Sequence, residues 1–122
     1  MDDDEYSREL VAAHLHGSGA RVLSAASAAE AFEVLQREHV DVLLADIGMP
    51  GEDGYAFIRR IRALPASEVA SVPAAALTAF AREDDRQQAL QAGFQLHLPK
   101  PIEPFSLVAA VNTLRRLKYA AS

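Results

Sequence analysis

The feature that most constrains this chain is a continuous apolar run, residues 42–45, that ends at Asp46 and opens into a loop containing glycine. A short run of this kind is typical of a strand that is buried on both faces of a parallel sheet. An acidic side chain at the end of such a strand is costly, because burial penalises its charge. Asp46 is therefore the first candidate for a functional residue.

Other polar residues stand in similar positions along the chain. Thr78 and Lys100 each follow a short apolar segment, and Asp2 and Asp3 stand at the start. In an open parallel sheet, the carboxyl ends of the strands converge on one crevice. We therefore expect these side chains to meet Asp46 in a single site.

Helical patterns alternate with the short apolar segments. The sequence predicts helices over residues 4–16, from 28 through at least 35, 57–64, 82–92 and from 104 onward, and strands over 21–25, 42–45, 74–77 and 94–98. Ser27 and Glu30 have the spacing of a capping box at the start of the second helix. This alternation indicates an α/β fold, a parallel sheet with helices on both faces, formed as one domain over residues 1–122.

Composition excludes several classes of protein. Half of the residues are hydrophobic, cysteine is absent and the formal net charge is −5. The chain is therefore not disordered, has no disulfide or thiolate metal site, and lacks the basic surface of a nucleic-acid-binding protein. No apolar run approaches the length of a membrane span. We expect a cytoplasmic protein that contacts neither nucleic acid nor membrane.

Four motifs in order carry a resemblance to a known family. They are the acidic pair, D-I-G-M-P-G-E-D-G around Asp46, T-A at Thr78–Ala79 and K-P at Lys100–Pro101. Together they resemble the receiver domain of two-component response regulators, from Asp2 to about Leu117. The resemblance implies a flavodoxin-like, doubly wound parallel sheet with strand order 2-1-3-4-5. It also implies a cis peptide bond between the lysine and the proline.

The resemblance implies a phosphoacceptor site. Asp46 would accept a phosphoryl group from the phosphohistidine of a histidine kinase or a histidine phosphotransfer protein. Asp3 and Asp46 would bind Mg²⁺, with Asp2 assisting through water and the backbone carbonyl of Gly48 as a further ligand. Magnesium prefers oxygen ligands, and it would offset the repulsion between a carboxylate and a phosphoryl group.

The remaining roles concern the phosphoryl group and its readout. By resemblance, Thr78, Ala79 and Lys100 would bind the phosphoryl group, with the lysine as its ion-pair partner. Thr78 and His97 would form a conformational switch. The downstream protein partner would bind the face made by the fourth helix, the fifth strand and the last helix.

Two functions remain open at this level. The first is a signalling switch that is not an independent enzyme, either a stand-alone regulator or the receiver of a hybrid kinase. The second is a degenerate receiver that acts only as a protein-binding module. An aspartyl phosphatase would need a second acid two residues after the nucleophile, and Gly48 occupies that position.

The chain departs from the family at its start, where only Met1 precedes the acidic pair. The family's first strand is central in the sheet, and burying its side chains contributes on the order of 8–12 kcal/mol. Three explanations compete: the chain is part of a longer one, the second and third strands pair directly, or another chain completes an edge in a homodimer. For residues 1–122 we expect association or low stability.

Overall fold

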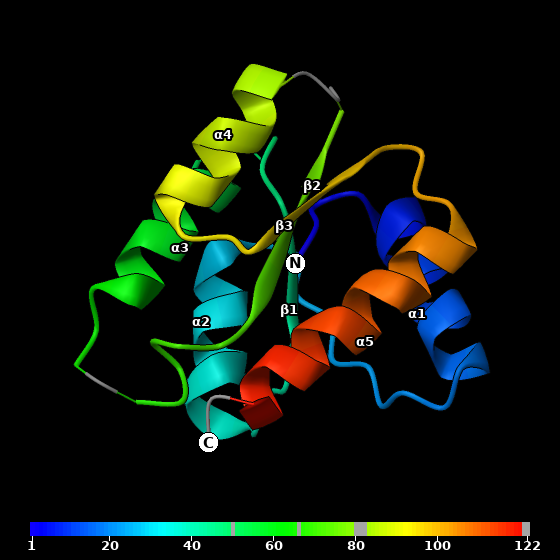
Figure 1. Ribbon diagram of the computed structural model, residues 1–122, viewed down its shortest axis with the longest axis horizontal. Coiled ribbons are helices and arrows are strands. Elements are labelled where there is room, and N and C mark those ends of the chain that lie inside the picture. Colours follow the sequence, from blue (N-terminus) through cyan, green and yellow to red (C-terminus); the bar gives the residue numbers. More distant parts are fainter. Residues whose placement is uncertain (50, 66, 80–82, 121–122) are drawn as a thin grey trace.

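The computed structural model describes residues 1–49, 51–65, 67–79 and 83–120 of the chain. Its described elements alternate between helix and strand after an initial helix pair (Figure 1). The helices are α1 (Glu5–Gly17), α2 (Ala28–Arg37), α3 (Gly54–Arg62), α4 (Glu83–Ala92) and α5 (Pro104–Ala120), and the strands are β1 (Leu43–Asp46), β2 (Ala74–Thr78) and β3 (Leu96–Pro99).

The three described strands form one parallel sheet in the order β1-β2-β3. In its register Ala45 lies opposite Ala76, and Ala76 lies opposite His97. The crossover helices α3 and α4 join consecutive strands. The sheet lies between α1 and α5 on one side and α2, α3 and α4 on the other (Figure 1). This arrangement confirms the predicted α/β fold with helices on both faces of a parallel sheet.

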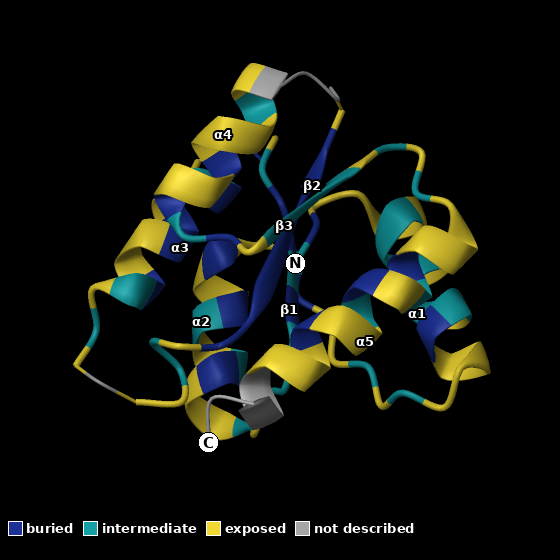
Figure 2. Ribbon diagram, in the orientation of Figure 1, coloured by how far each residue is buried: buried dark blue, intermediate teal, exposed yellow. Residues whose placement is uncertain are grey.

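The core lies on both faces of β2, whose five residues are all buried (Figure 2). On the side of α3, the side chains of Phe57, Ile58 and Ile61 are 0% exposed. On the side of α5, Leu107 and Leu114 are equally inaccessible. Alanine fills three of the five β2 positions, and these small side chains leave room for the large apolar side chains of the helices.

Capping residues fix where the helices begin. The hydroxyl of Ser27 accepts a hydrogen bond from the Glu30 N–H at 3.2 Å, and the Glu30 carboxylate accepts one from the Ala26 N–H at 3.3 Å. The serine half of the predicted capping box is thus confirmed, while the glutamate bonds to the N–H of the residue before the cap instead of that of Ser27. Asp53 caps α3 in a similar way, because its Oδ1 accepts a hydrogen bond from the Ala56 N–H at 2.8 Å.

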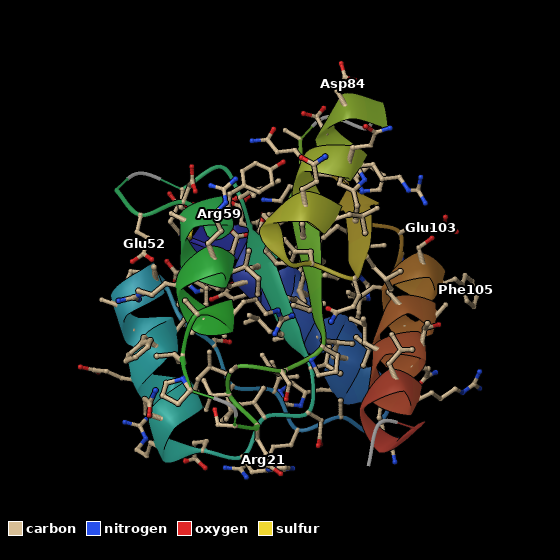
Figure 3. The ribbon with its side chains drawn as sticks, turned by 60° about the vertical axis from the view of Figure 1, so that its left-hand side comes forward. Arg21, Glu52, Arg59, Asp84, Glu103 and Phe105 are labelled. Atoms are coloured by element: carbon tan, nitrogen blue, oxygen red, sulfur yellow. The ribbon has the colours of Figure 1, made fainter. Side chains whose placement is uncertain are left out.

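Charged side chains occupy the outer surfaces of the helices. The labelled side chains of Arg59 on α3, Asp84 on α4 and Glu103 before α5 point away from the sheet (Figure 3). Among the described helices, none is both long enough and apolar enough to cross a bilayer.

The strand predicted over residues 21–25 is wrong, since the structure gives this segment no strand. Met1 and Asp2 lie between it and β1. The Met1 nitrogen donates to the Leu44 carbonyl at 2.7 Å, the Asp46 N–H donates to the Met1 carbonyl at 2.8 Å, and the Asp2 N–H donates to the Ala25 carbonyl at 3.1 Å. A strand requires a ladder of such bonds. Direct pairing of the second and third strands of the family pattern is therefore also wrong for this structure.

Candidate functional site

Asp46 ends β1 and is 7% exposed. Its Oδ1 accepts a hydrogen bond from the Gly48 N–H at 3.0 Å, which turns the chain sharply at the end of the strand. The side chain is thereby held at the carboxyl edge of the sheet, as the sequence predicts. Gly48 lies beside Asp46, and the ligand role of its carbonyl stays a prediction.

Gly54 brings α3 against the end of β1, and sequence reasoning missed this residue. A Cβ atom at Gly54 would lie 2.7 Å from the Asp46 carbonyl oxygen and 2.8 Å from the Ile47 Cα. Only glycine permits so close an approach of two backbones. The sequence signal was the Asp53-Gly54 pair, in which the aspartate caps the helix and the glycine makes the contact.

The acidic pair reaches the same edge from the start of the chain. One carboxylate oxygen from each of Asp2, Asp3 and Asp46 lies within 4.8 Å of the others. Asp2 is 3% exposed, whereas Asp3 is exposed to solvent. The Asp2 carboxylate accepts a hydrogen bond from the Asp4 N–H at 3.0 Å, and the Arg8 guanidinium donates to the Asp2 carbonyl at 2.8 Å. The role of Arg8 as an anchor was not predicted.

Lys100 supplies the positive charge of the site. Its Nζ lies 3.2 Å from an Asp2 oxygen and 3.2 Å from an Asp46 oxygen, so one ammonium group joins the two buried carboxylates. The backbone N–H of Lys100 donates to the Thr78 carbonyl at 2.6 Å. The peptide bond between Lys100 and Pro101 is cis, as the resemblance implied.

The environment raises the pKa of Lys100 above its ordinary value. Desolvation by burial alone lowers this pKa, but the hydrogen bond to Asp2 and the negative charges of Asp46 and Asp2 outweigh that effect. The ammonium form is therefore the form that the site holds at neutral pH. A fixed cation beside Asp46 favours the binding of an anionic group.

Thr78 on β2 and His97 on β3 are diagonal neighbours in the sheet. Thr78 is 4% exposed, and its hydroxyl shares a hydrogen bond with the His97 Nε2 at 2.8 Å. The next residue, Ala79, is exposed. The predicted switch pair is thus in direct contact, while the phosphoryl-binding roles of Thr78 and Ala79 stay predictions.

The Met1 nitrogen is a buried titratable group that the sequence did not point to. Desolvation by burial lowers its pKa from 8.0 to about 6, although the charges of Asp2 and Asp46 partly oppose this shift. The nitrogen lies behind the acidic pair, where it joins the first residue to β1. Its burial means that the charged form is disfavoured in the folded chain.

The donor set suits a hard divalent cation. Three carboxylates share a small space at the edge of the sheet, and carboxylate oxygen is the ligand that Mg²⁺ prefers. Without a cation, their mutual repulsion is offset only in part by one ammonium group. The residues present therefore fit a magnesium site, in which Asp2, Asp3 and Asp46 would supply the protein ligands.

A family model described as the response regulator receiver domain matches residues 1–112. An uncharacterised 14.6 kDa protein from Leptolyngbya boryana is 45% identical over 112 residues, which make up 92% of this chain and 84% of that protein. The response regulator Rre1 of Synechocystis is 37% identical over 123 residues and matches all of this chain, which spans 52% of Rre1.

The fold also matches solved structures. A putative response regulator from Chloroflexus aurantiacus superposes with a TM-score of 0.88 at 33% sequence identity. The match covers 95% of this chain and 93% of that one. The similarity thus extends over nearly the whole length of both chains.

Proposed function

Because the chain belongs to the response regulator receiver family, we propose that Asp46 accepts a phosphoryl group from a phosphohistidine and that this modification switches a protein-binding surface. Receiver domains take part in two-component signalling with histidine kinases or phosphotransfer proteins, and they are not enzymes in the usual sense. The donor for this chain would be a protein of that kind. We place the reaction in the cytoplasm.

One observation carries the proposal: the ammonium group of Lys100 lies 3.2 Å from both Asp2 and Asp46. These three residues come from the start of the chain, the end of β1 and the residue after β3. A surface ion pair would not require two buried carboxylates. The arrangement is that expected of a site that positions an anionic group beside an acceptor oxygen.

The proposed transfer is a substitution at phosphorus. A carboxylate oxygen of Asp46 forms a new O–P bond, the N–P bond of the donor breaks, and the released imidazole takes up a proton. Lys100 lies where it can pair with the phosphoryl oxygens and stabilise their charge. When bound, Mg²⁺ would supply the positive charge that lowers the repulsion between the carboxylate and the phosphoryl group.

The proposed readout starts at Thr78. Its hydroxyl now bonds to His97 Nε2, and where the hydroxyl is the donor of this bond it would exchange the histidine for a phosphoryl oxygen. That change would reach β3 and the helices that flank it. The partner surface would comprise α4, β3 and α5, where Phe105 is 84% exposed and projects outward from the start of α5 (Figure 3).

Phosphorylation by acetyl phosphate tests the site directly. We expect the parent chain, with Mg²⁺, to gain the mass of one phosphoryl group, and Asp46→Asn to gain none. Lys100→Met should slow the reaction by about 100-fold, because it removes a donor to the developing charge. Asp84→Asn, which changes an exposed aspartate on α4, is the matched control and should react like the parent.

The same measurement decides between a phosphoacceptor and a binding module. A folded parent chain that gains no mass at saturating Mg²⁺ and acetyl phosphate would refute phosphoacceptance. Chelation by EDTA should abolish the reaction of the parent. If the chain reacts equally well without a divalent cation, the proposed role of the three carboxylates is wrong.

A further inference from the structure

Asp3 is the member of the acidic site that the structure holds least firmly. It is exposed, and in the described part of the chain no hydrogen bond or ion pair fixes its side chain. The residues on either side of it are fixed. The Asp2 N–H donates to the Ala25 carbonyl at 3.1 Å. The Asp4 carboxylate accepts a hydrogen bond from the Tyr6 N–H at 3.2 Å. The direction of the Asp3 carboxylate therefore depends on the peptide groups beside it.

Arg8 holds the peptide group that joins Asp2 to Asp3. Its guanidinium donates from Nη1 to the Asp2 carbonyl, which is the oxygen of that peptide group, at 2.8 Å. Arg8 is half-buried in α1, and its backbone N–H donates to the Asp4 carbonyl at 3.0 Å, so the side chain folds back over the start of the helix. A guanidinium donates along fixed directions in one plane. The bond therefore restricts the rotation of this peptide group, and with it the direction in which the Asp3 side chain leaves the backbone.

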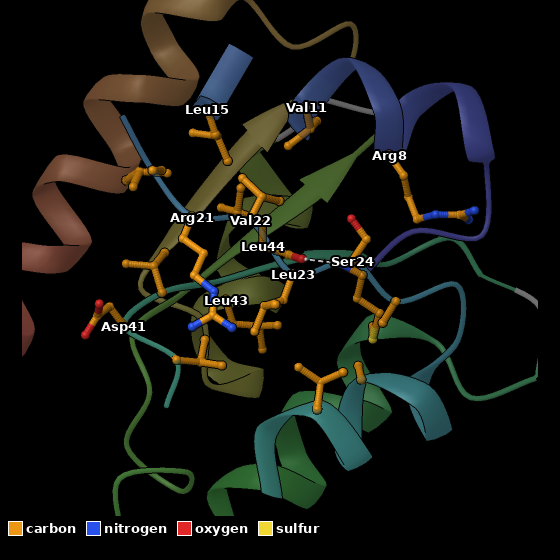
Figure 4. Close-up of a pocket in the computed structure, with 18 of the residues that line it drawn as sticks. Arg8, Val11, Leu15, Arg21, Val22, Leu23, Ser24, Asp41, Leu43 and Leu44 are labelled. Carbon is orange, nitrogen blue, oxygen red and sulfur yellow. Dashed lines mark hydrogen bonds between the residues drawn. The ribbon is translucent and has the colours of Figure 1, made fainter. Parts of the chain in front are cut away.

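Arg8 reaches this carbonyl from the side of a groove. The groove has a volume of about 650 Å³ and lies between β1 and residues 20–25, and Figure 4 shows the Arg8 side chain leaving α1 beside it. Met1 and Asp2 also line the groove. Two cations thus hold Asp2 at different atoms, because the Lys100 Nζ lies 3.2 Å from its carboxylate while Arg8 bonds to its backbone.

The charge of Arg8 and its hydrogen bond would act on a bound Mg²⁺ in opposite directions. The charge repels the ion, but solvent and salt screen this repulsion because Asp3 is exposed. The bond restricts the direction of a ligand, and Mg²⁺ demands near-octahedral geometry. Among the residues that the structure describes, Arg8 pairs with no carboxylate, so it occupies no ligand oxygen. Loss of a group that orients a ligand typically costs about 10–100-fold in metal affinity, so the bond should outweigh the charge.

We propose that Arg8 is a positioning residue for the divalent cation, which it serves by holding the peptide group between Asp2 and Asp3. Carboxylate oxygens of Asp2, Asp3 and Asp46 lie within 4.8 Å of one another, and the Arg8 bond explains how the exposed Asp3 keeps its place among them. The inference rests on the proposed function for the identity of the ion. It does not require that Asp46 accept a phosphoryl group.

Calorimetric titration of the unphosphorylated chain with Mg²⁺, without a phosphoryl donor, tests the proposal. Arg8→Met keeps the apolar stem but removes the charge and the bond, and its Kd should be about 10-fold higher than that of the parent. Arg8→Lys keeps the charge, and its Kd should rise by less, because an ammonium group can still donate one bond. Arg37→Met, which changes an exposed arginine on α2, is the matched control and should bind like the parent. An unchanged or lower Kd in Arg8→Met would overturn the proposal, since loss of charge alone predicts tighter binding.

A double-mutant cycle shows whether Arg8 acts through Asp3. In an Asp3→Asn chain, Arg8→Met should raise the Kd by less than about 2-fold, because the carboxylate that Arg8 orients is then absent. A further loss of about 10-fold in that chain would assign the effect to general disruption of the structure and would overturn the proposal. Thermal unfolding checks that each variant is folded, and Arg8→Lys replaces Arg8→Met in the cycle if the latter does not fold.

The dependence of phosphorylation on Mg²⁺ gives a second measurement. With acetyl phosphate, Arg8→Met should need about 10-fold more Mg²⁺ for its half-maximal rate and should reach the parent rate at saturation. A lower maximal rate with an unchanged Mg²⁺ requirement would overturn the proposal. A chain that shows the Arg8 effect on Mg²⁺ binding but gains no phosphoryl group would refute phosphoacceptance alone. A parent chain that binds no Mg²⁺ would overturn this inference together with the metal role of the three carboxylates.

Discussion

The two edges of β1 differ in how they are held. One edge pairs with β2 along the whole strand, from Leu43 opposite Ala74 to Asp46 opposite Leu77. At the other edge, two hydrogen bonds to Met1 are followed by the groove. The phosphoacceptor candidate therefore stands between an edge that is paired along its whole length and an edge that is held by two hydrogen bonds. Family membership alone would not have revealed this asymmetry.

Because of this difference, the structure holds some residues of the site more firmly than others. Asp46 and Lys100 belong to strands and loops of the paired side, whereas Asp2 and Asp3 depend on a short segment at the open edge. That segment is held by its backbone bonds, by Arg8 and by the Lys100 contact. The acceptor position is thus better fixed than the acidic pair that would bind the metal.

The largest expected effect contrasts the truncation of a buried and of an exposed apolar side chain. Phe57→Ala, on the paired side, should lower the free energy of unfolding by about 3–5 kcal/mol, because Phe57 is 0% exposed and its loss leaves a cavity. Leu23→Ala, beside the groove, should cost about 1 kcal/mol or less, because Leu23 is 41% exposed. Urea unfolding of both variants measures the contrast. Equal costs would show that the two edges are packed alike.

A smaller effect concerns pH and the Met1 nitrogen. Its pKa in the folded chain is about 6, below the ordinary 8.0, so the unfolded chain binds more protons between these values. Stability should therefore rise with pH from about 6 to about 8, by at most roughly 3 kcal/mol. Below pH 6 the penalty for burying the charged nitrogen is present in full.

Acetylation of the Met1 nitrogen isolates this contribution, because an acetylated chain keeps every other titrating group. The difference in unfolding free energy between the parent and the acetylated chain should shrink as pH rises through this range. Urea titrations at several pH values measure it. A difference that is independent of pH would mean that the nitrogen is not buried.

The smallest effect tests the contact between α3 and β1. Gly54→Ala should cost about 1–2 kcal/mol, because the new methyl group would press on the Asp46 carbonyl and the Ile47 backbone. It should also slow phosphorylation by displacing Asp46. Gly17→Ala is the matched control, since a Cβ there meets nothing within 4 Å. Thermal unfolding that ranks the two variants equally would exclude the steric argument.

Much of the fold could be predicted because its signals are local. The apolar runs predict the positions of β1 and β2 to within one residue at each end, and the Ser27–Glu30 pair predicts the start of α2. The site could be predicted in part, because parallel strands bring their carboxyl ends together. Asp2, Asp46 and Lys100 indeed meet there.

What could not be predicted depends on partners that lie elsewhere in the chain. Residues 21–25 have a strand-like sequence, yet a strand requires a ladder of backbone hydrogen bonds, and the bond from the Asp2 N–H to the Ala25 carbonyl is not such a ladder. The close approach at Gly54 depends on where β1 ends in space. The anchoring of Asp2 by Arg8 follows from the geometry of α1, and the spacing of residues in the sequence does not predict it.

The contact between Lys100 and Asp2 joins residues 98 positions apart in the chain. During synthesis, the acidic pair leaves the ribosome long before Lys100 and stays without this counter-charge until β3 and the following loop have emerged. The carboxylate of Asp2 cannot be buried next to that of Asp46 in that interval without a large electrostatic penalty. The candidate site should therefore be among the last parts of the molecule to assemble, after the helices and the sheet have formed.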